Sequence, residues 1–455
     1  MGGRKKISLL VTIASILLVV SLLGWLLSII FEGEKPQINV MPLPEFLAGR
    51  QEFALTLKDM RRGLKKLEVA VIQEGREISV YERQFPYEGL LNRDGVHRFD
   101  TRFFLDPSKL NLAQGRVDLK VRVWDYSRRS GGDGNLSLFQ HKIMVDTIPP
   151  AIRAVSRLNY INAGGAGLIV YQASSDTIKS GLYVNDIFFS GFPAHEELRK
   201  GLHVCYFAVP HDTKEKPEIY LWAEDRAGNR SRGKFHYNIR RKRFRQQRMN
   251  ITDRFLERVL PYFSFYDLDA DAGNIEKFLK INRDLRNENA SVYYDLRTKT
   301  VPRQLWNGTW QRLKNAATMA GFGDRRTYYY KGDDIDRQVH LGVDLASLAN
   351  AKVQAANHGL VIFADRLGIY GLTVILDHGQ GLASIYSHLS KIDVKPDDEI
   401  TKGEIIGLTG QTGLAGGDHL HFGIMVGGVF VNPIEWWDSH WIQDNVTRKL
   451  ARLEK

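Results

Sequence analysis

Five side chains of the kinds that bind metal ions are concentrated near the C-terminal end of the chain. Their positions are His340, Asp344, His388, His419 and His421. Successive side chains on a strand point to opposite faces, so His419 and His421 should share one face while Leu420 points to the other. Imidazole and carboxylate groups suit zinc, whose catalytic sites use three protein ligands and keep a fourth position for water. Five candidates exceed that number, and the residue types alone leave open which of them hold the metal.

The segment that leads to His388 is also expected to be a strand. Simple alternation places Ser384, Tyr386 and His388 on one face, with Ala383 and Ile385 on the other. On that face the Tyr386 hydroxyl could form a hydrogen bond with a substrate, or Tyr386 could serve only in packing.

The three segments resemble the LytM/lysostaphin-type zinc metallopeptidases, whose pattern is H-x-x-x-D, then H, then H-x-H. The resemblance extends from about Asp336 to Trp437 and includes the closing Asn432-Pro433. It also includes the glycine-rich approach Gly410-Gln-Thr-Gly413. The longer stretch 410–417 matches neither the dinucleotide-binding nor the P-loop pattern and leads into a strand. We interpret this stretch as a turn that presents the last two histidines.

The resemblance implies a role for each of the five side chains. His340, Asp344 and His421 would bind Zn²⁺, and His388 and His419 would be the catalytic histidines. It also implies an antiparallel-β domain that hydrolyses peptide cross-links of peptidoglycan with zinc-activated water. No position of the pattern is substituted, whereas relatives that only activate other enzymes typically lack zinc ligands.

Length and composition indicate several folded domains. A chain of 455 residues exceeds a single ordinary core, and 43% hydrophobic with 25% charged residues is typical of globular proteins. The net charge of +11 favours anionic surroundings such as lipid headgroups or cell-wall polymer. Nucleic acid is not an expected partner, because the sequence has no motif for binding it. The single cysteine, Cys205, lies in an apolar stretch and is expected to be a small buried side chain.

The N-terminal segment is expected to cross a membrane once. Residues 7–31 contain no charged side chain, and these 25 residues, at about 1.5 Å each, can span a bilayer. Basic residues 4–6 precede the run and Glu32 follows it, so the positive-inside rule predicts a cytoplasmic N-terminus and places the rest of the chain outside the cytoplasm. Nothing resembles a wall-sorting signal, and membrane tethering suits a periplasm as the outer compartment. An uncleaved anchor in the cell inner membrane is favoured over a cleaved signal peptide, because no small-residue cleavage pattern follows the run.

The next region has the pattern of two immunoglobulin-like β-sandwiches. Apolar residues alternate with charged ones over 117–123, as in a half-buried strand. A related arrangement recurs 100 residues further on, from Asp125 to Asp225, and that offset is the size of one such domain. The prolines of the junction 146–150 fix an extended connection, and the region resembles bacterial immunoglobulin-like repeats. A single irregular β domain is the alternative.

A basic and helical linker is expected before the peptidase domain. The basic run at 240–248 could be a solvated surface or could contact anionic wall polymer or lipid headgroups. Thr252 is a suitable N-cap, and helical periodicity extends from about 250 to 331. The segment from about 250 to 338 could form a lid over the zinc cleft, as a segment before the peptidase domain does in some relatives.

The peptidase domain itself should be mostly β. Short strands rich in β-forming residues are expected at 359–364, 372–376 and 383–386, with glycines in the turns between them. Trp436 and Trp437 are expected to pack the last helix against the sheets, with carbohydrate stacking as the alternative.

Together these patterns predict a mainly β protein with an N-terminal transmembrane helix, two immunoglobulin-like β-sandwiches, a short helical linker and a C-terminal LytM-type domain. The expected divisions are 1–35 for the cytoplasmic stub and signal anchor, 36–147 and 148–240 for the two sandwiches, 241–334 for the linker and 335–455 for the peptidase domain.

The predicted function is that of a membrane-anchored zinc metalloendopeptidase acting on peptidoglycan. The sandwiches would be spacers or docking modules for envelope proteins. The alternative is a LytM-domain regulator or adaptor that recruits or activates another cell-wall hydrolase.

Overall fold

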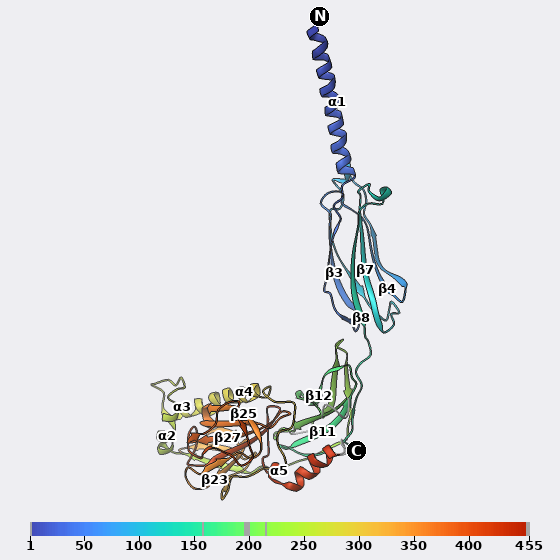
Figure 1. Ribbon diagram of the computed structural model, residues 1–455. Helices are drawn as coiled ribbons and strands as arrows, with labels where there is room; N and C mark the ends of the chain where they lie inside the picture. The colour runs from blue at the N-terminus through green and yellow to red at the C-terminus, as the bar shows by residue number, and fades with distance from the viewer. Residues whose placement is uncertain (1, 157–158, 195–200, 214–215, 452–455) are drawn as a thin grey trace. The chain divides into compact units, whose positions relative to one another are not determined.

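The computed structural model describes residues 2–156, 159–194, 201–213 and 216–451. The chain forms two compact units: the first extends to Pro149 and includes Arg226–Asn229, and the second begins at Pro150. Strands dominate both units, and one long helix stands at the N-terminus (Figure 1). The predicted class, a mainly β protein with an N-terminal apolar helix, is therefore confirmed, while the finer division into five segments stays a prediction.

The N-terminal helix is α1 (Gly2–Ile30), and its stretch Ile7–Ile30 is long and apolar enough to cross a membrane. The carbonyl oxygens at its end accept hydrogen bonds from the loop that follows β7 (Gly115–Asp125). Arg128 N donates to Ile30 O at 2.9 Å, and Arg129 Nε donates to Phe31 O at 2.8 Å.

The first unit contains a sandwich of two sheets around one hydrophobic core. The sheets have the orders β1-β3-β6 and β2-β8-β7-β4-β5. Phe53 and Phe103 stack in the core with their ring centroids 5.2 Å apart. Every second residue of β7 from Val117 to Val123 is buried, so the predicted alternation is confirmed. The strands are β1 (Gln37–Met41), β2 (Phe46–Leu47), β3 (Gln51–Lys58), β4 (Leu64–Gln73), β5 (Arg76–Gln84), β6 (Arg98–Leu105), β7 (Gly115–Asp125) and β8 (Leu136–Val145).

The second unit begins with two four-stranded sheets and a parallel strand pair. Their orders are β14-β15-β11-β9, β13-β12-β16-β17 and β10-β18. Cys205 lies in β15 and is fully buried, as expected. The strands are β9 (Ile152–Ala154), β10 (Asn159–Asn162), β11 (Ala166–Ala173), β12 (Thr177–Val184), β13 (Ile187–Ser190), β14 (Phe192–Pro193), β15 (Leu202–Ala208), β16 (Ile219–Asp225), β17 (Arg230–Gly233) and β18 (Tyr237–Arg240).

The segment expected to be a helical linker is helical only in its middle. The side chain of Thr252 accepts a hydrogen bond from Phe255 N and caps the first helix, as predicted. The helices are α2 (Asp253–Val259), α3 (Asn274–Lys280) and α4 (Arg286–Leu296), with a π-helical turn at Ile281–Leu285.

The prediction of helical periodicity up to residue 331 is wrong beyond α4. The end of the basic run forms β19 (Gln246–Ile251), which pairs in parallel with β21 (Arg325–Tyr330), and β21 pairs with β22 (Asp333–Val339). β20 (Ala317–Ala320) joins the large sheet of the C-terminal part. Pairing with strands distant in the sequence outweighs the local pattern here.

The C-terminal part is built on an eight-stranded sheet. Its order is β20-β23-β31-β27-β26-β25-β29, with β32 paired to β31. The same part of the chain also forms a three-stranded sheet with the order β24-β30-β28. The strands predicted at 359–364, 372–376 and 383–386 are contained in β25, β26 and β27. The remaining strands are β23 (Val343–Ala346), β24 (Lys352–Gln354), β25 (Gly359–Arg366), β26 (Leu372–Asp377), β27 (Leu382–Leu389), β28 (Lys391–Ile392), β29 (Glu399–Ile400), β30 (Ile405–Leu408), β31 (Leu420–Val426) and β32 (Val429–Val431), followed by the helices α5 (Ile434–Trp437), α6 (Ser439–Ile442) and α7 (Arg448–Leu450).

One hydrophobic core is shared by both parts of the second unit. Trp436 of α5 is fully buried, with its ring centroid 6.2 Å from that of Tyr206 in β15 and 5.2 Å from that of Trp310. The Glu435 carboxylate accepts hydrogen bonds from Asn162 Nδ2 at 2.7 Å and from Ala166 N at 2.9 Å. Trp436 therefore packs as expected, and the strands after Pro150 support the peptidase sheet directly.

Candidate metal centre

The strand order brings the sequence-predicted site residues together. β23 pairs antiparallel with β31 so that Asp344 is directly opposite His421. Residues opposite one another in an antiparallel pair place their side chains on the same face at close range. β27, which carries His388, lies on the other side of β31, and His340 stands in the loop before β23.

Three atoms from these residues form a small triangle. His340 Nε2 lies 2.8 Å from Asp344 Oδ1 and 3.0 Å from His421 Nδ1. His421 Nδ1 lies 2.9 Å from Asp344 Oδ1. All three residues are at least nine-tenths buried. The set is the one predicted to bind metal, and its three atoms face one point.

Main-chain carbonyl oxygens orient three of the four histidines. The Nδ1 atoms of His340, His388 and His419 each lie 2.8 Å from a carbonyl oxygen, that of Gly321, Thr412 and Gly417 respectively. A carbonyl oxygen can only accept, so each Nδ1 carries a proton. In the neutral ring Nε2 then presents its lone pair, and this is the tautomer that a metal ligand or a general base requires.

The donor set fits zinc. His340 Nε2 and Asp344 Oδ1 both present lone pairs to each other at 2.8 Å, an arrangement that a cation between them would satisfy. Zinc binds imidazole nitrogen and carboxylate oxygen at about 2.0–2.2 Å, which puts tetrahedral ligand atoms about 3.3 Å apart. The three observed separations of 2.8, 2.9 and 3.0 Å require only a small expansion to reach that value.

His421 faces the other two residues through Nδ1 instead of Nε2, and packing holds its ring in this orientation. Its Nδ1 faces the other ligands, and its Nε2 is buried without a hydrogen-bond partner among the described residues. A Cβ atom added to Gly342 would lie 2.5 Å from Nε2 and 2.8 Å from Phe422 O. The glycine inside the His340–Asp344 segment thus leaves the space that the His421 ring occupies.

A bulge turns His388 into the cleft. Between Leu372 and Val374 of β26, β27 contains one extra residue, and His388 has a φ of 61°. A bulge shifts the alternation of a strand, so His388 does not share a face with Tyr386.

The prediction that Tyr386 faces the cleft is therefore wrong. Tyr386 is opposite Phe422 in the ladder and is 1% exposed. Its hydroxyl accepts hydrogen bonds from Ala356 N and Ser384 Oγ, so its role is packing.

The two remaining histidines lie side by side next to the triangle. The ring centroids of His388 and His419 are 4.9 Å apart, and His419 Nε2 is 3.6 Å from Asp344 Oδ1. The stretch 410–417 holds both rings, because it supplies the carbonyls of Thr412 and Gly417. Our interpretation of this stretch as a turn that presents the histidines agrees with these contacts.

Burial and charge set the protonation of the site. Burial acts to raise the pKa of Asp344, but the charge and hydrogen bond of His340, with the hydrogen bonds of His419 and His421, hold it well below its usual range. Burial lowers the pKa of His388 well below its ordinary value and lowers that of His421 to about 4. Burial also acts to lower the pKa of His419, but the hydrogen bond and charge of Asp344 outweigh it and raise that pKa. An ionised carboxylate and neutral imidazoles are the forms that bind metal.

Three groups that orient the ligands were not predicted. Arg326 Nη2 lies 3.0 Å from Asp344 Oδ2 and leaves Oδ1 to face the histidines. Gly321 and Thr412 act through their carbonyl oxygens, as described above. Arg326 and Gly321 come from the segment before the motif, where no residue spacing connects them with the ligands.

The histidines line a cleft of about 530 Å³. Met249, Ile251 and Phe255, from the segment before the peptidase domain, line the same cleft. Arg258 of α2 reaches across to the stretch 410–417, where its Nη2 donates to Gly416 O at 2.8 Å.

Comparison with known proteins agrees with this geometry. Residues 338–433 match the family model described as Peptidase family M23, and the match includes all five site residues. This part of the chain is a peptidase M23 domain. The LytM-type resemblance found in the sequence is confirmed.

The M23 domain is similar to curated relatives over a short region only. It is 35% identical over 97 residues to DD-carboxypeptidase/endopeptidase Mpg of Neisseria meningitidis, which is 21% of this chain and 22% of that protein. It is 35% identical over 96 residues to peptidoglycan DD-endopeptidase ShyA of Vibrio cholerae, 21% of this chain and 22% of that protein. The murein hydrolase activator EnvC of Escherichia coli is 35% identical over 95 residues, 21% of this chain and 23% of that protein. The chain spans about a fifth of the length of these relatives.

Solved structures also match the M23 domain. The catalytic domain of lysostaphin from Staphylococcus simulans is 29% identical, with a TM-score of 0.26, and the match covers 29% of this chain and 98% of that domain. A peptidase M23 structure from Pseudomonas aeruginosa is 21% identical, with a TM-score of 0.38, and the match covers 61% of this chain and 95% of that one.

Proposed function

We propose that the chain is a membrane-anchored zinc metalloendopeptidase that hydrolyses peptide cross-links of peptidoglycan in the periplasm. One observation carries this proposal: three ligand atoms face one point, and the Nδ1 atoms of the two histidines beside them are held by carbonyl oxygens. The relatives named as a peptidoglycan DD-endopeptidase and a DD-carboxypeptidase/endopeptidase support this substrate class.

In this proposal His340, Asp344 and His421 hold Zn²⁺ through Nε2, Oδ1 and Nδ1. When bound, zinc supplies Lewis acidity that lowers the pKa of water toward about 7 and polarises the scissile carbonyl. Of His388 and His419, one takes the proton of the attacking water, and the other stabilises the oxyanion or protonates the leaving amine. Both rings can do so because each Nδ1 is held by a carbonyl oxygen, which leaves Nε2 toward the cleft.

The substrate would occupy more than the metal cleft. A second cavity of about 820 Å³ in the same unit is also lined by Arg326 and Tyr370. Arg286 and Arg337 add positive charge to its walls, which suits the carboxylates of a cross-linked peptide.

The segment before the M23 domain would restrict access to the cleft. Arg258 joins α2 to the stretch that orients the catalytic histidines, so α2 would be the part of the lid that moves. Arg258→Ala should then raise kcat/KM on peptidoglycan, and unchanged kinetics would indicate a static wall. A single span by α1 would place both units outside the cytoplasm, which protease accessibility in spheroplasts tests.

The decisive experiment is mass spectrometry of the fragments released from purified peptidoglycan by the full, zinc-loaded chain in detergent. The wild type should remove cross-linked muropeptides, and the fragment masses name the bond that is cut. His421→Ala and His388→Ala should release nothing. His440→Ala is the matched control, because its side chain is 96% exposed and should leave activity unchanged.

A regulator is the second candidate, since one relative is named a murein hydrolase activator. It predicts stoichiometric zinc with no released fragments, together with faster hydrolysis when the chain is added to a purified cell-wall amidase. Release of fragments by the wild type alone would contradict it.

A further inference from the structure

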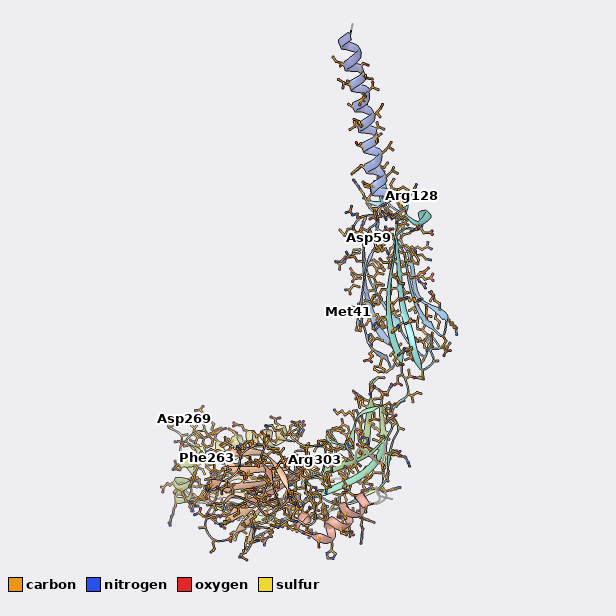
Figure 2. The ribbon with its side chains drawn as sticks, viewed as in Figure 1. Met41, Asp59, Arg128, Phe263, Asp269 and Arg303 are labelled. Atoms are coloured by element: carbon orange, nitrogen blue, oxygen red, sulfur yellow. The ribbon has the colours of Figure 1, made fainter. Side chains whose placement is uncertain are left out.

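Three buried carboxylates gather at one end of the first sandwich. Glu32 follows α1, Asp59 follows β3, and Asp125 is the last residue of β7. One oxygen from each residue lies within 4.8 Å of the others. Glu32 is 8% exposed, Asp59 4% and Asp125 0%. Figure 2 shows Asp59 and Arg128 at the end of the sandwich next to α1.

The two oxygens of the Asp59 carboxylate differ in their hydrogen bonds. Asp59 Oδ1 accepts from the main-chain N–H groups of Arg61, Arg62 and Gly63 at 2.9 to 3.0 Å. Asp59 Oδ2 is buried and has no hydrogen-bond partner among the described residues. A buried carboxylate oxygen in this condition is costly unless a cation binds it.

The Asn135 side chain joins Glu32 to Asp125. Asn135 Nδ2, which has two hydrogens, lies within 3.2 Å of four oxygens: Glu32 O, Glu32 Oε1, Glu34 O and Asp125 Oδ2. The N–H groups of Glu34, Ser127 and Asn135 donate to Glu32 Oε2 and Asp125 Oδ1, and Ser127 Oγ donates to Glu32 O. Among the described residues, Asp59 Oδ2 is therefore the carboxylate oxygen of the cluster that is left without a donor.

Nearby positive charge does not compensate the cluster. The Arg62 guanidinium is buried, yet it donates to the carbonyl oxygens of Leu91 and Tyr126. Burial raises the pKa of Glu32 and of Asp59, and the charge of Asp125 acts in the same direction on both. Within the part of the chain that the structure describes, these three acids share a small volume and none of them forms an ion pair with a basic side chain.

We propose that Glu32, Asp59 and Asp125 bind one Ca²⁺ ion where α1 enters the first sandwich. The ligands are all oxygen, which selects a hard cation, and Ca²⁺ accepts six to eight such ligands in irregular geometry, whereas Mg²⁺ demands a near-ideal octahedron. The bound ion joins the residue that follows the apolar helix to the ends of β3 and β7. It therefore stiffens the connection between the anchor and the sandwich.

Isothermal titration of CaCl₂ into the full, zinc-loaded chain in calcium-free detergent buffer tests the proposal. The wild type should bind one Ca²⁺ per chain with a Kd of about 1 mM or lower, the range of extracellular sites. Saturating Ca²⁺ should raise the midpoint of thermal unfolding of the first unit. Absence of both effects would overturn the proposal, and an equal response to MgCl₂ would overturn the assignment to calcium.

Matched variants locate the site. Glu32→Gln and Asp59→Asn should each abolish the calcium response. Glu34→Gln, a half-exposed carboxylate two residues from Glu32 that pairs with Arg61, should keep it. Asp344→Asn should also keep it, since the zinc cluster is separate. Calcium binding that survives in both Glu32→Gln and Asp59→Asn contradicts the site.

The effect of Asp59→Asn on the midpoint of thermal unfolding distinguishes a carboxylate that binds Ca²⁺ from one that only supports the fold. In calcium-free buffer Asp59→Asn removes one of three like charges, so its midpoint should equal or exceed that of the wild type. An equal loss of stability with and without Ca²⁺ would show that the carboxylate only holds the turn at Arg61–Gly63.

Discussion

The two compact units each contain a buried cluster of metal-ligand type, but the clusters are built in opposite ways. In the second unit the ligand atoms are nitrogen and oxygen, and main-chain carbonyls, a glycine and Arg326 orient them. In the first unit the atoms are all oxygen, and Asp59 Oδ2 has no hydrogen-bond partner among the residues that the structure describes. In our proposals the cluster of the second unit serves chemistry on a substrate, and the cluster of the first unit holds parts of the protein together.

The cores that surround the clusters differ as well. The first unit closes around its own core, whereas the strands after Pro150 share a core with the M23 domain through Tyr206, Trp310 and Trp436. The second β region thus supports the M23 domain and its candidate metal centre. A sandwich of similar size can be either a separate module or a support, according to what its faces contact.

The largest expected difference between the two clusters is the effect of losing a proposed zinc ligand on zinc retention and activity. Asp344→Asn removes the only anionic ligand of the zinc cluster and should abolish zinc retention. Activity on peptidoglycan should fall by at least about 1000-fold, because zinc supplies several kcal/mol of transition-state stabilisation. Metal analysis and muropeptide release measure the two effects. Asp365→Asn, an exposed carboxylate of the same domain, is the control, and retained activity in Asp344→Asn would contradict the assignment.

Truncation of a core side chain should destabilise only the unit that contains it, and calorimetry should show this as a shift of one unfolding transition. Trp436→Ala should cost about 3–5 kcal/mol and lower the midpoint of the transition that includes residues 150–240 together with the M23 domain. Phe53→Ala, at the Phe53–Phe103 stack, should cost a similar amount in the other transition only. If Trp436→Ala left a transition of residues 150–240 unchanged, the shared core would not be cooperative.

The stability of the second unit should decrease as pH rises, through Glu435. Burial raises the pKa of Glu435 from 4.5 to about 7, so the folded state keeps a proton that the unfolded state has lost. Stability therefore falls between those pH values, by up to about 3 kcal/mol. Denaturant unfolding of wild type and Glu435→Gln should show this slope in the wild type alone. Glu257→Gln, an exposed carboxylate, should leave the slope in place.

A single methyl group should loosen zinc without loss of the fold. Gly342→Ala places a carbon 2.5 Å from the His421 ring and should reduce zinc affinity about 10- to 100-fold by displacing that ligand. Competition with a zinc-binding dye measures the affinity. Gly416→Ala, where an added Cβ meets nothing within 4 Å, is the matched control.

The residues of the candidate metal centre could be found from sequence because they belong to short segments in which type and spacing are local. The orientation of His388 could not, because the bulge in β27 depends on its register with β26. Strict alternation therefore placed Tyr386 in the cleft, although it packs against Phe422. The helical expectation beyond Leu296 failed because β21 gains its stability from strands that are distant in the chain. The acidic cluster has no sequence pattern, since three separate elements contribute one residue each.

The carbonyl oxygens that fix the histidine tautomers have a consequence for how this site can change over time. They belong to the main chain, so no replacement of the side chains at positions 321, 412 and 417 deletes them. Only a change in the path of the backbone can do so. The surrounding loops are thus free to acquire new side chains, and with them new substrate preferences, while the proton arrangement of the metal site is inherited intact.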